Sequence, residues 1–244
     1  MNPESFPFPA VDCHVHLSPS LTIDRAMQLS HMRGVRFGIV EHPGAHMAIP
    51  DDAALARYLD LLEPYPVYKG LQPVFPGWKA AFSSELLARL DYILMDALTL
   101  PQPDGSWLEI WRPNTPVADP QAFMLRYLDF CARVLTEEPI NIFGWPTFLP
   151  DSIAAQYDSL WTEERMQRLI ALAATRRIAI EINEFARVPG ARFIRLAKQA
   201  GLKFTFGTDS RDERAGVLTY GLAMVKNCGL AETDMFSPAA SRPS

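Results

Sequence analysis

The sequence has few cysteines, and their spacing excludes a disulfide framework. Cys13, Cys131 and Cys228 are odd in number, lie far apart and form no Cys-x-x-Cys pair. Neither a set of disulfides nor a cysteine zinc site is expected, and the thiols fit a reducing compartment. No apolar run approaches the ~20 residues of a membrane-spanning helix, and residues 1–10 lack the parts of a signal peptide. We therefore expect a cytoplasmic protein with no membrane partner.

The sequence also lacks an excess of positive charge. The formal net charge is -5, from 23 Lys and Arg against 28 Asp and Glu. A mildly acidic surface gives no electrostatic attraction for nucleic acid. We expect a small-molecule substrate and no nucleic-acid partner, and a few local arginines suffice to bind that substrate if it is anionic.

No glycine-rich phosphate or dinucleotide motif follows any expected strand. The sequence is instead organised by short apolar runs that alternate with amphipathic stretches. The expected strands are residues 10–17, 35–40, 67–75, 92–98, 140–145, 178–182 and 203–206. The expected helices are residues 21–33, 53–62, 80–90, 121–136, 163–176, 191–200 and 213–227.

This alternation predicts a parallel sheet with helices outside it. About seven units favour a distorted (β/α)7 TIM-like barrel, which is a single α/β domain. The domain is expected to fill residues 1–244, with a core at about 10–228 and a flexible tail at 237–244. The long segment 99–119 is expected to be a lid, a binding loop or a surface insertion.

All five histidines lie between positions 14 and 46. His14 and His16 stand two apart on the first expected strand, so their side chains point the same way. Two adjacent imidazoles are costly to protonate together, whereas a divalent metal ion uses both lone pairs. We predict that both are metal ligands, with a polar strand end as the alternative. His31 is expected at the surface or the end of a helix. His46 follows a Pro-Gly turn in a loop, from which it could enter the site.

Polar side chains stand at the ends of four other expected strands, where barrel enzymes place their active sites. These residues are Glu41 and His42, Asp96, Glu181 and Asn183, and Asp209. Each one also fits a structural role, such as a helix cap or a hydrogen bond inside the barrel. Their common location predicts one site, in which Arg211 is placed to meet an anionic group.

Several short motifs, in this order, resemble those of the polymerase and histidinol phosphatase (PHP) domain. Residues 11–16 resemble its opening His-x-His motif, which amidohydrolases share. Residues 38–42 resemble its second motif, residues 181–183 its sixth-strand motif and residues 207–210 its final aspartate motif. The resemblance covers residues 10 to about 216. It implies a distorted seven-unit barrel and metal-dependent phosphoester hydrolysis, often with two or three ions.

The sequence departs from that family at four positions. Gln72, Leu98, Trp145 and Arg211 stand where the resemblance places acidic or histidine ligands. The ligands that match are His14, His16, His42 and Asp209, and they suffice for one ion. Zn²⁺ is the first choice, with Mn²⁺ or Fe²⁺ as alternatives.

The remaining site residues divide between catalysis and binding. Glu41 or Asp96 would orient or deprotonate the metal-bound water. Arg211, Trp145, Glu181 and Asn183 are assigned to substrate binding.

The function expected from the sequence is a metal-dependent hydrolase that acts on a phosphoester through metal-bound hydroxide. One alternative is an inactive barrel that binds a ligand or a partner protein. It is favoured by Trp145, because an indole in the place of a metal ligand fills the cavity. A further alternative is an amidohydrolase-type enzyme acting on a C–N or C–C bond.

Overall fold

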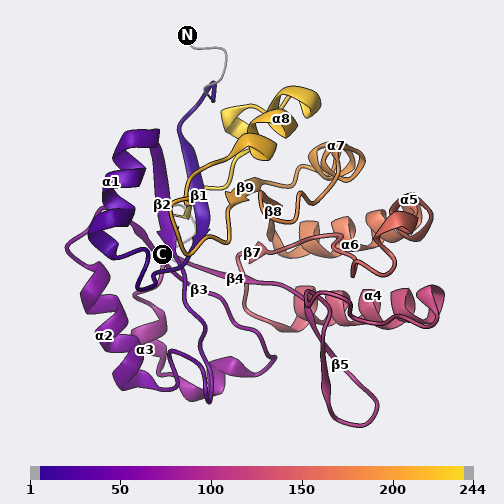
Figure 1. Ribbon diagram of the computed structural model, residues 1–244, viewed down its shortest axis with the longest axis horizontal. Helices are drawn as coiled ribbons and strands as arrows, with labels where there is room; N and C mark the ends of the chain where they lie inside the picture. The colour runs from indigo at the N-terminus through magenta and orange to yellow at the C-terminus, as the bar shows by residue number, and fades with distance from the viewer. Residues whose placement is uncertain (1–5, 239–244) are drawn as a thin grey trace.

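A closed barrel of parallel strands forms the centre of the computed structural model, which describes residues 6–238 (Figure 1). The strands follow the order β1-β2-β3-β4-β7-β8-β9, and β9 closes the barrel on β1 where Phe206 pairs with Asp12. The barrel strands are β1 (Ala10–Val15), β2 (Val35–Ile39), β3 (Tyr68–Leu71), β4 (Tyr92–Met95), β7 (Ile142–Phe143), β8 (Ala179–Asn183) and β9 (Phe204–Gly207). The expected single-domain TIM-like barrel is confirmed. Residues 239–244 of the expected flexible tail lie outside the described residues.

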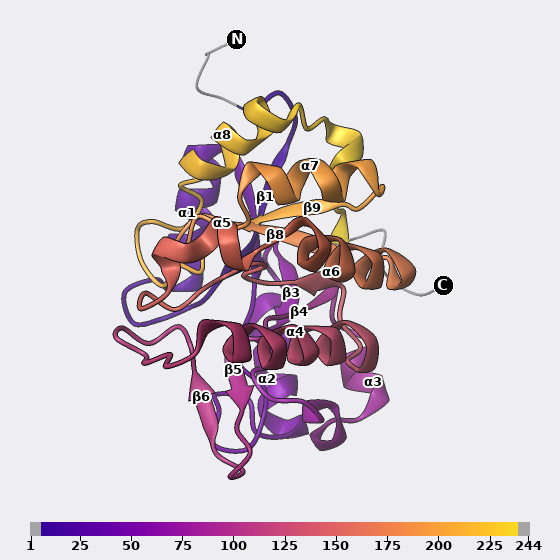
Figure 2. The same cartoon turned by 90° about the vertical axis from the view of Figure 1, so that its right-hand side faces the viewer.

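Helices surround the barrel on its outside, as the two views of the ribbon show (Figures 1 and 2). They are α1 (Ile23–Arg33), α2 (Asp52–Leu62), α3 (Ser84–Leu87), α4 (Pro120–Glu137), α5 (Tyr157–Leu160), α6 (Glu163–Arg176), α7 (Ala191–Gln199) and α8 (Thr219–Cys228). Thr22, Asp51, Asp119 and Thr162 each accept a hydrogen bond from a free N–H of the first turn. These caps fix where four of the helices begin.

Three segments differ from the sequence-based expectation. The helix expected at 80–90 is a 3₁₀ turn (Trp78–Ala81) followed by α3, because the backbone is extended at Phe82 and Ser83. The helix expected at 213–227 begins only at α8, because the backbone N–H groups of Arg214 and Gly216 donate to the carboxylates of Asp212 and Asp12, which holds the preceding residues in turns. The segment 99–119 contains an antiparallel hairpin of β5 (Thr99–Pro101) and β6 (Trp107–Glu109).

The half of the barrel below the strand ends is filled by side chains. Tyr92 is buried there and donates a hydrogen bond of 2.7 Å to the carbonyl oxygen of Cys13. Its ring lies so close to Gly70 that a Cβ there would stand 2.5 Å from it. The barrel is therefore closed at this level, and open space remains only towards the carboxyl ends of the strands. Among residues 6–238, no helix is long and apolar enough to cross a bilayer.

Candidate metal centre

Every strand of the barrel places a functional side chain at or just beyond its carboxyl end. In strand order these residues are His14 and His16 (β1), Glu41 and His42 (β2), Gln72 (β3), Asp96 (β4), Trp145 (β7), Glu181 (β8) and Asp209 (β9). The closed topology brings them to one mouth, as the sequence predicted.

His14 is completely buried and is held from both sides. Its Nδ1 lies 2.6 Å from Oε1 of Glu181, and its Nε2 lies 2.9 Å from Oε1 of Gln72. Nε2 is also 3.4 Å from Oδ1 of Asp209. Burial opposes a positive charge, but the carboxylates of Asp209 and Glu181 outweigh it and raise the pKa of His14 to about 10. In this arrangement His14 is an imidazolium that donates through both nitrogens.

His16 is equally buried, yet neither of its ring nitrogens has a hydrogen-bond partner among residues 6–238. Its Nε2 lies 3.4 Å from Oδ1 of Asp209, and its Nδ1 lies 4.0 Å from Oε1 of Glu41. Burial, assisted by the positive charges of His14 and Arg211, lowers the pKa of His16 to about 3. A neutral imidazole carries one N–H and one lone pair, and neither has a hydrogen-bond partner among residues 6–238, so a cation bound by the lone pair and by the carboxylate of Asp209 would satisfy both groups.

His42 lies beside His16, with ring centroids 4.9 Å apart. Its Nδ1 is 2.9 Å from the backbone carbonyl oxygen of Gln72, which accepts the Nδ1 hydrogen. This contact fixes the tautomer and leaves the Nε2 lone pair directed into the site. The Nδ1 of His14 is likewise held by an oxygen acceptor, Oε1 of Glu181. Metal-binding histidines usually donate the hydrogen of their other ring nitrogen to such an oxygen.

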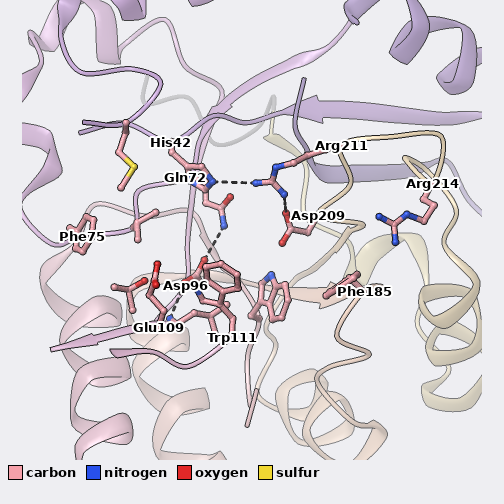
Figure 3. Close-up of a pocket in the computed structure, with 15 residues that line it drawn as sticks. His42, Gln72, Phe75, Asp96, Glu109, Trp111, Phe185, Asp209, Arg211 and Arg214 are labelled. Carbon is pink, nitrogen blue, oxygen red and sulfur yellow. Dashed lines mark hydrogen bonds and ion pairs between the residues drawn. The ribbon is translucent and has the colours of Figure 1, made fainter. Parts of the chain in front are cut away.

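Asp209 stands at the centre of the cluster. Its backbone has φ of 47°, a left-handed conformation that a residue with a Cβ rarely adopts. Its Oδ1 lies 2.9 Å from Nη1 of Arg211, whose Nη2 is 3.3 Å from Nε2 of His42 (Figure 3). Burial acts to raise the pKa of Asp209, but His14, His16 and Arg211 together hold it well below its usual range. Asp209 is therefore an ionised ligand at any pH near neutrality.

Two overlapping groups of ligand atoms follow from this geometry. His14, His16 and Asp209 form the first, and His16, Glu41 and His42 form the second. In each group the ligand atoms lie within 4.8 Å of one another. The four predicted metal ligands thus lie in two adjoining groups at the mouth, and His16 belongs to both. His31 and His46 are exposed and belong to neither group within the described part of the chain.

Gln72 links the metal ligands to the predicted catalytic residue Asp96. Its Nε2 lies 2.9 Å from Oδ2 of Asp96, while its Oε1 contacts His14 (Figure 3). Burial raises the pKa of Asp96. A half-turn of the amide would let Gln72 donate to a neutral His14 and accept from a protonated Asp96. One proton can therefore be held either by His14 or by Asp96, with the amide of Gln72 oriented to match.

Glu181, Trp145 and Asn183 were assigned to substrate binding, and the structure gives them different positions. Glu181 is fully buried behind His14, and its Oε2 accepts a hydrogen bond of 2.8 Å from the backbone N–H of Trp145. A Cβ at Gly207 would lie 1.9 Å from Oε1 of Glu181, so only glycine leaves room for this carboxylate. Asn183 is buried and accepts from the backbone N–H of Ala186. Trp145, like Asp209, has a left-handed backbone with φ of 47°.

A cavity of about 500 Å³ opens above the ligands. Trp145, Arg211, Asp96, His42 and Asp209 line it, whereas Glu181 and Asn183 are absent from its lining as drawn from residues 6–238. The other lining residues are Met47, Gln72, Val74, Phe75, Leu98, Thr99, Glu109, Trp111, Phe185 and Arg214. Most of the wall is apolar, and Arg211 and Asp209 lie beside His42, whereas Glu109 and Arg214 lie apart from them (Figure 3). This is the usual composition of a ligand pocket.

Sequence reasoning missed part of this cavity. Glu109, Trp111 and Phe185 were not among the predicted site residues. Phe185 keeps 63 % of its surface exposed and Trp111 keeps 45 %, which is unusual for such large apolar side chains. Their position in segments without regular structure gave no periodicity from which to infer their direction.

Comparisons with known proteins give little further information. No protein-family model and no curated protein matches this chain. One similar solved structure is a chain in a cryo-EM structure of archaeal ribonuclease P with mature tRNA. The similarity has a TM-score of 0.44 and 14% sequence identity, and it covers 91% of this chain and 87% of that chain.

This finding corrects two expectations from the sequence. The similar chain belongs to an assembly with tRNA, which stands against a small-molecule phosphoester hydrolase and against the exclusion of a nucleic-acid partner. Those expectations and the two alternative functions are withdrawn. At this TM-score the similarity likewise assigns no RNA-related role to the present chain.

Proposed function

We propose that this protein is a metal-dependent enzyme with one divalent ion at the mouth of its barrel. His14, His16 and Asp209 would hold the ion, and His42 belongs to the neighbouring group of ligand atoms with His16 and Glu41. The observation that carries the proposal is the state of His16, which is buried with two unpartnered ring nitrogens and faces an ionised carboxylate. An ion between Nε2 of His16 and Oδ1 of Asp209 would satisfy both.

The ligand atoms also fit a divalent metal ion. Imidazole nitrogens with one carboxylate suit Zn²⁺ first, with Mn²⁺ or Fe²⁺ as alternatives. The carbonyl behind His42 and the carboxylate behind His14 fix their ring orientations before an ion arrives. Nε2 of His14 has to lose its proton on binding, and the contact with Gln72 and Asp96 offers that proton an acceptor.

The position of the site favours a catalytic ion over a structural one. Structural zinc sites are closed, whereas catalytic sites keep a coordination position open to the ligand. Asp209 lines the cavity, so an ion held by it would face the cavity. A bound divalent ion acts as a Lewis acid towards a group in the cavity. Glu41 and Asp96 are the carboxyl groups placed to move a proton there.

We also propose that the chain is a divergent PHP-type barrel. The support is the number of strands and the order in which the strands deliver His14, His16, His42 and Asp209 to the mouth. The cytoplasmic location expected from the sequence stays a prediction.

The test is elemental analysis of the purified full-length chain after it has been loaded with zinc and desalted. We expect about one ion per chain in the wild type and none in the double variant His14→Ala, His16→Ala. The matched control is the double variant His31→Ala, His46→Ala, which removes two exposed histidines and should keep the ion. Circular dichroism checks that all three proteins are folded. A wild type without zinc, manganese or iron, or equal metal content in the two double variants, would overturn the proposal.

A further inference from the structure

The two groups of ligand atoms share His16 but face different sides of it. The first group uses the side on which Nε2 meets Asp209, and the second uses the side on which Nδ1 meets Glu41. The second group also includes His42, whose Nε2 lone pair is available because Nδ1 donates to a backbone carbonyl. The mouth of the barrel thus offers two neighbouring positions for a cation.

One positive charge of the protein already lies between these positions. The guanidinium of Arg211 places Nη1 2.9 Å from Oδ1 of Asp209 and Nη2 3.3 Å from Nε2 of His42 (Figure 3). It therefore contacts a ligand atom of each group at once. The lone pair of His42 that a metal ion would use is the one that Arg211 engages.

The guanidinium is a permanent cation, because arginine does not deprotonate in proteins. A divalent ion beside Glu41 and His42 would have to displace it or bear its repulsion at close range. In the first position Arg211 contacts only the carboxylate of Asp209, which a cation and a guanidinium can share, and the two histidine ligands are not engaged by it in the described residues.

We propose that Arg211 takes the place of a second metal ion. The position formed by His16, Glu41 and His42 is a cation site that the guanidinium blocks through its contact with Nε2 of His42, so the centre binds one metal ion and gains a second when the guanidinium is removed. This inference rests on the proposed function, because it supposes that the first position binds metal.

The experiment is a Zn²⁺ titration followed by elemental analysis of wild type, Arg211→Ala and Arg211→Leu, of which the second keeps more of the packing should the first not fold. Arg214→Ala is the matched control: Arg214 also lines the cavity, but it pairs with Asp212 at 2.9 Å. We expect one ion in the wild type and in Arg214→Ala, and two in both Arg211 variants. The second ion should bind at least about tenfold more weakly when His42→Ala is added to Arg211→Ala.

The outcomes separate the two proposals. One ion in the wild type and one in both Arg211 variants would overturn the role of Arg211 and leave the proposed function standing. Two ions in the wild type would overturn the role of Arg211, because the guanidinium would then not exclude the second ion, and would also contradict the single ion of the proposed function. No ion in the wild type but one in the Arg211 variants would support the role of Arg211 as the resident cation and overturn the proposed function. A second ion that is unaffected by His42→Ala would overturn the assigned position.

Discussion

Replacing His16 by glutamine should change how the stability of the metal-free protein depends on pH. Burial lowers the pKa of His16 from 6.5 to about 3 in the folded protein. The unfolded chain therefore binds a proton at His16 between these two values, and the folded chain does not. By linkage, the stability that neutral His16 allows is present above about pH 6.5 and is lost as the pH falls towards 3.

The size of the effect follows from the same two values. Between about pH 7 and about pH 5, the unfolded state gains about 2 kcal/mol from protonating His16, while the folded state gains almost nothing. His14 acts in the opposite direction, because its raised pKa of about 10 contributes stability that is lost as the pH rises above about 6.5. These two residues together place the maximum stability of the metal-free protein near that pH.

The assay is urea unfolding with a chelator present, at about pH 7 and about pH 5. The wild type should lose about 2 kcal/mol more than His16→Gln over this interval. His31→Gln, which removes an exposed histidine, should follow the wild type. Equal acid sensitivity in the wild type and His16→Gln would refute the reasoning, because His16 would then protonate as easily in the folded protein as in the unfolded one.

Two further predictions concern residues behind the ligands. Glu181→Gln removes the charge that orients His14, so zinc affinity measured by calorimetry should fall by about 10–100-fold while the fold is kept; unchanged affinity would mean that Glu181 serves only the packing of Trp145. Asp12→Ala removes the acceptor of hydrogen bonds from the backbone N–H groups of His14, Thr208 and Gly216, and should reduce the free energy of unfolding by about 3 kcal/mol or more in urea. Asp12→Asn, which keeps one acceptor oxygen, should lose less, and an equal loss would contradict this account.

The elements with strong periodicity and clear caps could be predicted from the sequence. The helix α6 begins and ends where the pattern placed it, because Thr162 caps its first turn. Strand β7 is shorter than its apolar run, because only Ile142 and Phe143 pair with both neighbours. Apolar residues beyond the paired segment are buried by packing, and burial alone gives no strand boundary.

The convergence of His14, His16, His42 and Asp209 was predictable for a related reason. A barrel delivers every strand end to the same mouth, so a polar residue at such an end has few other places to lie. The hydrogen bonds among these residues were not predictable. That Glu181 would contact His14 rather than the cavity depends on the direction of a side chain in β8, which the sequence pattern leaves open.

The hairpin β5–β6 projects from the barrel beside α4 (Figures 1 and 2). This hairpin and the residues that follow it supply Thr99, Glu109 and Trp111 to the cavity, and within residues 6–238 they contribute nothing to either ligand group. Mutations in this hairpin and in the residues that follow it can therefore accumulate, in nature or in the laboratory. They would change the shape of the cavity above the proposed metal centre, and hence the ligands that it accepts, while the affinity for the ion stays the same.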